Sequence, residues 1–185
     1  MPIANAQEVF LHELGDIYDA EHRFLEGQQF MAQKATNQDL KSAIDRHIEQ
    51  TGEQIRNLQR VFERLGQEPH RETCDASMGL LSEARQDIDG SENEAVCDLV
   101  VDTAVVKVEH YEIASYRNLI TGARLMERSE IEHLLQENLQ QEEETARIAE
   151  SSAETLLREA MGEQEGPGEE TKGLIGEAKE KLTGR

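Results

Sequence analysis

Apolar residues recur along most of this chain at steps of three and four, the spacing that places them on one face of an α-helix. In the first such stretch, Phe10, Leu14 and Ile17 share a face. The alternation typical of β-strands is nearly absent, and Ala, Leu, Glu, Gln and Arg, which favour helices, are abundant. The pattern predicts four long helices, over residues 6–35, from a turn at 37–39 to 65, over 93–125 and over 129–161.

Turn-forming residues mark the predicted helix ends. The turn Asn37-Gln38-Asp39 can cap the second helix, and Gly66 with Pro69 shortly beyond ends it. Ser129, with Glu132 three residues later, resembles a capping box that would begin the last helix.

The order of these elements predicts two helical hairpins joined by a long connection, which carries a shorter helix over residues 76–89. We therefore expect an all-α fold, a ferritin-like four-helix bundle with a long crossover carrying a short fifth helix. A simple up-down bundle is the structural alternative. The bundle is predicted to occupy residues 1–161.

The remaining residues, 162–185, differ in composition from the bundle. They contain Gly-Pro-Gly and many acidic residues, which favour a flexible linker, and the segment 174–182 can form a short helix. Residues 172–184 also resemble, weakly, the repeat of small CsbD-like stress proteins. We expect a flexible, solubilising tail, with docking to a protein partner as the alternative.

Charge and composition exclude several classes of protein. Asp and Glu number 39 against 19 Lys and Arg, a formal net charge of −20 that would repel nucleic acid and anionic membranes. No stretch approaches the roughly 20 apolar residues of a membrane span, and the first residues lack a signal-peptide pattern. We expect a cytoplasmic protein whose two cysteines, Cys74 and Cys97, are reduced thiols without metal-ligand spacing.

Four acidic residues interrupt the apolar faces where a bundle usually buries Leu, Ile and Val. Glu21 lies at the centre of the first helix's face, and Glu142 at the centre of the last. Glu109 and Glu112, three residues apart, are adjacent on the face of the third long helix. On the second helix, His47 faces the core. All five lie near the middle of their helices, so an antiparallel bundle can bring them together at one level.

The same count of 100° per residue sorts the neighbouring polar residues. Thr51 and Gln54 face the core beside His47. Asp16, Asp19 and Glu26 are predicted to point away from it.

Buried carboxylates cannot remain ionised together without compensation, because burial and mutual repulsion both raise their pKa values. Two divalent cations would remove both costs, and a carboxylate-rich site with an imidazole suits iron or manganese. The predicted metal ligands are Glu21, His47, Glu109, Glu112 and Glu142. The alternatives are an inward Glu that pairs with Arg and a His47 that is an ordinary core residue.

Several segments resemble the YciE/YciF family of ferritin-like bacterial stress proteins, over residues 8–161. The most specific is the ten-residue block from Lys107 to Tyr116; the others are residues 16–21, 47–51 and 74–80. The resemblance implies a five-helix ferritin-like fold, a di-iron centre, an association with stress responses and homodimers.

The chain departs from that family's pattern around the imidazole. Gln50 replaces an acid beside His47, and neither Glu49 nor Glu142 is followed by a His three residues later, because Gly52 and Thr145 stand there. The site is therefore poor in imidazole, which puts one metal position in doubt.

Three functions are compatible with these residues. The first is a di-iron oxidoreductase acting on peroxide or oxygen, with iron as the expected metal and manganese as the alternative. The second is iron scavenging or storage without turnover. The third is a structural helical dimer whose metal site has degenerated.

Overall fold

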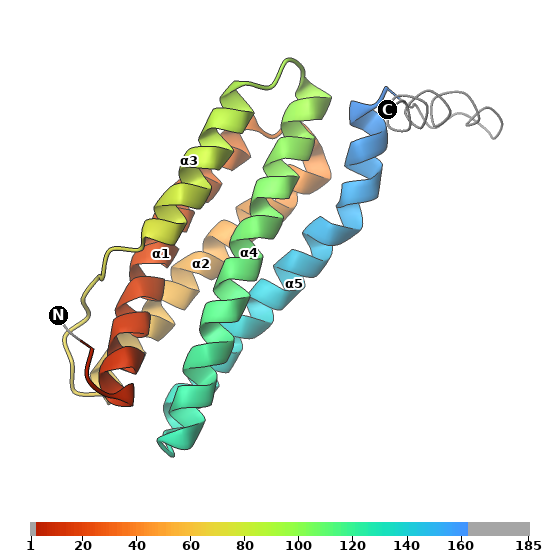
Figure 1. The fold of residues 1–185 in the computed structure, drawn as a ribbon. Helices are drawn as coiled ribbons and strands as arrows, with labels where there is room; N and C mark the ends of the chain where they lie inside the picture. The colour runs from red at the N-terminus through yellow and green to blue at the C-terminus, as the bar shows by residue number, and fades with distance from the viewer. Residues whose placement is uncertain (1–2, 163–185) are drawn as a thin grey trace, which may run out of the picture.

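The computed structural model describes residues 3–162, which form five α-helices and no strand (Figure 1). The helices are α1 (Ala6–Lys34), α2 (Gln38–Arg64), α3 (Asp75–Asp89), α4 (Glu94–Leu125) and α5 (Ser129–Ala160). The predicted helices agree with these to within a residue or two, and the all-α fold is confirmed. The predicted tail, 162–185, and its segment 174–182 lie outside the described residues except for Gly162.

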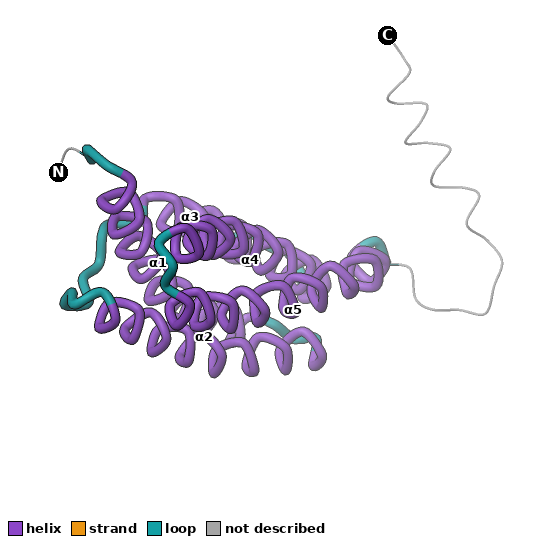
Figure 2. Tube along the Cα trace, turned by 90° about the horizontal axis from the view of Figure 1, so that it is seen from below, coloured by secondary structure: helices purple, strands orange, loops and turns teal. Residues whose placement is uncertain are grey.

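The four long helices form two antiparallel hairpins, α1 with α2 and α4 with α5. The hairpins pack together through α1 on α4 and through α2 on α5. Residues 65–93 cross over between them and carry α3, which packs on α1 and α4 along one side of the bundle (Figure 2). This long crossover, rather than the short connection of a simple up-down bundle, is the topology that the sequence predicts.

Most of the predicted helix ends are confirmed. The Asn37 side chain accepts hydrogen bonds from the backbone N–H groups of Asp39 and Leu40. Gly66 adopts the left-handed φ of 67°, which lets the N–H of Gln67 reach back to the carbonyl of Phe62 and close the end of α2.

The predicted capping box is wrong. Ser129 is the first residue inside α5, and the N-cap position before it is Arg128, which makes no side-chain capping bond. The Glu132 carboxylate instead accepts two hydrogen bonds from the guanidinium of Arg124, at 2.9 and 2.7 Å. A charge-assisted bond to Arg outcompetes a bond to a neutral backbone N–H.

The core has two apolar clusters with a polar layer between them. One cluster gathers around Phe24, Phe62 and Leu135, and the other around Met31, Val101 and Leu156. The buried polar residues of the layer come from α1, α2, α4 and α5: they are Glu21, Gln28, His47, Thr51, Gln54, Glu109, Glu112, Asn138, Glu142 and Thr145. The apolar clusters therefore fix the helices on either side of a layer of buried polar side chains.

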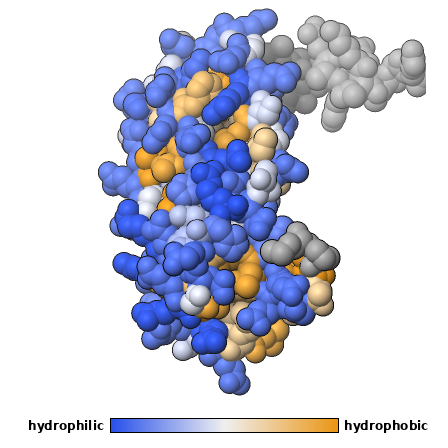
Figure 3. Space-filling model, turned by 90° about the vertical axis from the view of Figure 1, so that its left-hand side faces the viewer, coloured by the Kyte–Doolittle hydropathy of each residue, from blue (hydrophilic) through white to orange (hydrophobic). Residues whose placement is uncertain are grey.

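The surface is mainly hydrophilic, in keeping with the acidic composition. On the face shown in Figure 3, apolar residues form separate patches among hydrophilic ones. None of the helices that the structure describes is long and apolar enough to cross a membrane.

Candidate metal centre

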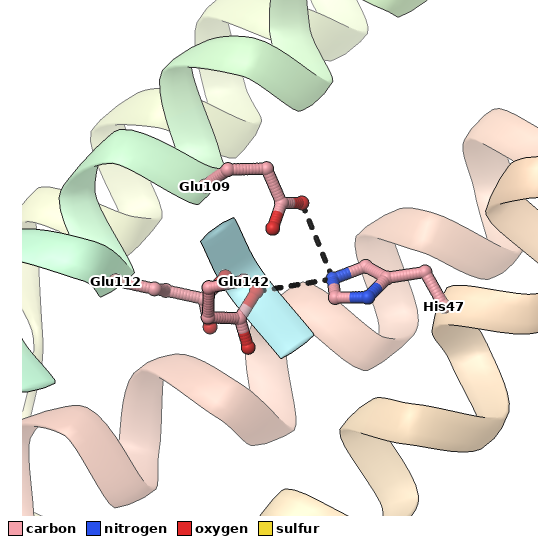
Figure 4. Close-up of side chains that lie close together, drawn as sticks. All are labelled: His47, Glu109, Glu112 and Glu142. Carbon is pink, nitrogen blue, oxygen red and sulfur yellow. Dashed lines mark ion pairs between the residues drawn. The ribbon is translucent and has the colours of Figure 1, made fainter. Parts of the chain in front are cut away.

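Four of the five predicted ligands meet in the polar layer. His47 comes from α2, Glu109 and Glu112 from α4, and Glu142 from α5. Each offers one ligand atom, and these atoms all lie within 4.8 Å of one another. All four side chains are buried, with at most 2% of any residue exposed. Figure 4 shows the three carboxylates and the imidazole ring converging on one small volume.

The α4 sequence places two carboxylates at this level. Glu109 and Glu112 are separated by three residues, so both project from one face of the helix. Their neighbours on that face, Val105, Ile113 and Tyr116, are buried in the core. Packing of these neighbours holds the two acids inside the bundle.

The orientation of His47 directs one ring nitrogen at the carboxylates. Its Nε2 lies 3.2 Å from Glu109 Oε1 and 3.4 Å from Glu142 Oε2 (Figure 4). Neither contact has hydrogen-bond geometry, and among the described residues Nε2 has no hydrogen-bond partner. The nitrogen and the two oxygens face one another in the way that side chains binding a common cation do.

The other ring nitrogen of His47 is held by two side chains of the layer. Nδ1 lies 3.3 Å from Gln50 Oε1 and 3.1 Å from Thr145 Oγ1. The amide oxygen of Gln50 can only accept, and the Thr145 hydroxyl donates to the carbonyl of Gln141. Nδ1 therefore carries the proton, which leaves the lone pair of a neutral ring on Nε2.

Burial dominates the electrostatics of the site. It raises the pKa of Glu109 to about 7 and the pKa values of Glu112 and Glu142 well above their usual range. Mutual repulsion adds to this effect, because the Glu142 charge raises the pKa of Glu112 and the Glu109 charge raises that of Glu142. Without added positive charge, the three acids cannot all be ionised at neutral pH.

Many oxygen atoms of the site lack a hydrogen bond. Within the described part of the chain, neither carboxylate oxygen of Glu112 or Glu142 has a hydrogen-bond partner, and Glu109 Oε2 also has none. A buried acceptor without a partner costs roughly 1–3 kcal/mol, and more when it is charged. A divalent cation would satisfy these oxygens and compensate their charge, so the donor set fits a metal.

Glu21, the fifth predicted ligand, lies beside this group rather than within it. It is completely buried, and its Oε1 accepts a hydrogen bond from the hydroxyl of Tyr116. Its Oε2 has no partner among residues 3–162. Burial raises the pKa of Glu21, and the charge of Glu142 raises it further. One oxygen of Glu21 is therefore buried without a hydrogen-bond partner in the described structure.

Comparison with known proteins places the chain in a family. Residues 5–162 match the family described as Domain of unknown function (DUF892). The chain is also 35% identical over 146 residues to Protein YciF of Escherichia coli, which covers 78% of this chain and 88% of that protein. The chain belongs to the DUF892 family. This confirms the resemblance to YciE/YciF proteins.

Solved structures of proteins similar in sequence to this chain share its fold. The crystal structure of the E. coli stress protein YciF is 33% identical, covers 83% of this chain and 98% of that chain, and has a TM-score of 0.79. YcfI from Rhodopseudomonas palustris, described as a candidate structural protein, is 34% identical with a TM-score of 0.79 and covers 80% and 95% of the two chains.

One buried acid of this DUF892 chain was misplaced by the helical count. Asp19 was predicted to point away from the core, but only 3% of it is exposed. It accepts hydrogen bonds from the Cys74 backbone N–H at 3.0 Å, from Arg71 at 2.7 Å and from Arg23 at 2.5 Å. Burial alone would raise the pKa of Asp19, but these bonds outweigh it and lower the pKa.

The count failed at Asp19 because it considers only the face that packs on the other long helices. The crossover covers a second face of α1, and Asp19 anchors the crossover there. The spacing of Asp19 and Arg23, four residues apart, is the sequence signal of an ion pair at this position. Asp19 is therefore a structural residue and not a candidate ligand.

Proposed function

We propose that this chain binds two divalent metal ions in the polar layer, with iron as the metal and manganese as the alternative. The observation that carries the proposal is the group of four buried ligands within 4.8 Å of one another, whose oxygens lack hydrogen bonds. His47, Glu109, Glu112 and Glu142 would hold the ions, and Glu21 would complete the second position. Carboxylates with one imidazole form a donor set suited to iron or manganese.

The residues around the ligands support a built site rather than a degenerate one. Gln50 and Thr145, which depart from the family's pattern in the sequence, are the two partners of His47 Nδ1. A ligating histidine usually donates its second ring N–H in this way. A degenerate site would have no need to keep three buried acids at a cost in stability.

The proposed redox function depends on iron as the bound metal. When bound, an iron pair supplies electron transfer to or from peroxide or oxygen, and we infer that the protein acts on one of these in a stress response, in a cytoplasmic setting. The fold's own contribution is exclusion of bulk water from the layer, a fixed imidazole and five carboxylate oxygens free to bind. E. coli YciF, similar to this chain, is described as a stress protein.

Metal analysis tests this proposal. Wild type expressed with iron and manganese supplements should carry about two ions per chain, and Glu142→Gln should lose most of them. Glu143→Gln is the matched control, because Glu143 is the exposed neighbour of Glu142 on the same helix. Wild type that stays metal-free after anaerobic loading with Fe(II) would support the structural helical dimer instead.

Peroxide consumption separates the redox function from scavenging. If iron-loaded wild type consumes peroxide in the presence of an electron donor and Glu142→Gln does not, the oxidoreductase function is supported. Full iron content without turnover would support iron scavenging.

A further inference from the structure

A cavity of about 270 Å³ lies between α2 and α5, next to the metal centre. Its inner end is formed by His47, Thr145 and Gln28, all of them buried. Its opposite end is formed by exposed residues, among them Asp39, Ser151 and Thr155. The cavity therefore leads from the surface to the edge of the ligand group.

The walls between these two ends are apolar. They consist of buried aliphatic side chains from three helices: Leu40, Ile44, Val105, Ala149 and Leu156. Such walls favour a hydrocarbon over water, because water in the cavity would find few hydrogen-bond partners along them. The shape and lining suit an aliphatic chain that enters with one end against His47.

The inner end holds a hydrogen-bond donor without a partner. Gln28 is 2% exposed, and its Oε1 accepts a hydrogen bond of 3.0 Å from the hydroxyl of Thr51. Its Nε2 has no partner in the described structure. A buried N–H group in this state is costly, and an occupant with an oxygen acceptor would relieve that cost.

The charge around the inner end selects against an anionic occupant. Glu109 and Glu142 lie beside His47, and Glu112 lies within the same group. The whole chain carries a formal charge of −20. In the absence of bound cations, a carboxylate head group would add a further negative charge beside three acids that already cannot all be ionised, whereas a neutral oxygen would add none.

We propose that this cavity binds a neutral aliphatic molecule with a terminal oxygen function, of the alcohol, aldehyde or hydroperoxide class. Its oxygen accepts a hydrogen bond from Gln28 Nε2, and its chain lies along the apolar walls. Binding of this class follows from the cavity itself. The role of the molecule as a substrate of the metal centre rests on the function proposed above.

Calorimetric titration with two probes of equal chain length tests the inference. Protein freed of metal should bind 1-octanol with one site per chain and should bind octanoate at least tenfold more weakly. Gln28→Met keeps the side-chain volume and removes the donor, so it should weaken 1-octanol binding about threefold to tenfold.

A cavity-filling variant provides the second arm. Ala43 is half-buried and lines the cavity, so Ala43→Leu should abolish 1-octanol binding. Ala114→Leu is the matched control, because Ala114 is an exposed position on α4 outside the cavity, and this variant should bind as wild type does. Circular dichroism establishes that each variant is folded. The comparison of 1-octanol with octanoate uses wild type alone and so does not depend on how the variants fold.

Three results would overturn the inference: no saturable binding of 1-octanol to wild type, equal binding of octanoate, or unchanged binding in Ala43→Leu. Absent octanol binding together with a changed sedimentation mass in Ala43→Leu would assign the cavity to contact with a second copy of the chain. Metal content after loading with Fe(II), measured on the same protein, keeps the two proposals separate. If wild type binds 1-octanol but takes up no metal, only the proposed function is contradicted. If it takes up metal but does not bind 1-octanol, only this inference is contradicted.

Discussion

At the scale of single residues, the most informative one is His47. Its Nδ1 faces Gln50 and Thr145, and its Nε2 faces Glu109 and Glu142 without hydrogen-bond geometry. A lone pair aimed at carboxylate oxygens is unfavourable unless a cation lies between them or a proton is shared. Gln50 and Thr145 thus set the orientation that a metal ligand needs.

Replacing Gln50 tests this role. Gln50→Leu removes the acceptor for Nδ1–H and should weaken Fe(II) binding by about 10- to 100-fold, because outer partners orient the ligating ring. Gln86→Leu, an exposed position on α3, should bind as wild type does. Titration of metal-free protein with Fe(II) under anaerobic conditions measures both. Equal affinities in the two variants would show that Gln50 does not orient His47.

A second residue-scale prediction concerns Asp102, which is 1% exposed and accepts a hydrogen bond of 2.8 Å from Ser152 Oγ. Burial raises the pKa of Asp102, and the bond from Ser152 only partly opposes this. The folded state therefore binds the proton more tightly than the unfolded state does. This contribution to stability is present below the ordinary pKa and is lost as the pH rises through the folded one.

Asp102→Asn removes that titration. The free energy of unfolding of the variant, relative to that of wild type, should increase from pH 4 to pH 7. The increase should be on the order of 1 kcal/mol for each unit by which folding raises the pKa of Asp102. Urea denaturation at the two pH values measures the gain. Asp87→Asn, at an exposed position, serves as the control and should show no comparable gain. A gain of the same size in both variants would contradict this account of Asp102.

At the scale of elements, the crossover is held on α1 by polar contacts that are separate from the packing of the four long helices. Asp19 binds the crossover through Arg71 and the N–H of Cys74. The Cys74 side chain in turn accepts a hydrogen bond from the N–H of Ser77 and caps α3. The position of α3 against α1 therefore depends on a carboxylate that lies 55 residues before Cys74 in the sequence.

Removing this carboxylate should loosen the crossover. Asp19→Ala leaves Arg71 and the buried Cys74 N–H without their acceptor, and we expect a loss of about 3 kcal/mol in the free energy of unfolding. Glu26→Gln, an exposed position on α1, should change it little. Urea denaturation of both variants decides the matter. Equal stabilities would mean that Asp19 does not anchor the crossover.

The elements were predictable because their signals are local. Apolar spacing fixed the helix extents, and Asn37 and Gly66 marked ends whose chemistry involves only neighbouring residues. The capping box at Ser129 and the orientation of Asp19 were wrong because each carboxylate has a partner outside its own helix. The Glu132 carboxylate binds Arg124 of α4, and Asp19 binds Arg71 and the N–H of Cys74 in the crossover. The apolar spacing along one helix carries no information on such partners.

At the scale of the whole molecule, the inward residues were predictable because convergence follows from the fold. Acids in the middle of antiparallel helices meet wherever the hairpins pack, and His47, Glu109, Glu112 and Glu142 do so. The position of Glu21 beside that group depends on its bond to Tyr116, which helix spacing does not indicate. Two bound divalent cations would lower the magnitude of the net charge by four, and the remaining acidity belongs to the surface.

The oligomeric state is a whole-molecule prediction. We expect a homodimer, so sedimentation velocity should report about twice the chain mass of 20.9 kDa. A dimer is too small for the closed shell that iron storage requires, which leaves reaction or scavenging. A particle of many subunits would contradict the prediction and favour storage.

The central claim is that the buried group binds metal, and anomalous X-ray diffraction at the iron edge tests it most directly. For crystals of iron-loaded protein, we predict two anomalous peaks inside the bundle, within coordination distance of His47, Glu109, Glu112 and Glu142. Glu21 should contact the second peak. Iron-loaded crystals without an anomalous peak among these residues, or with peaks at surface acids alone, would contradict the account.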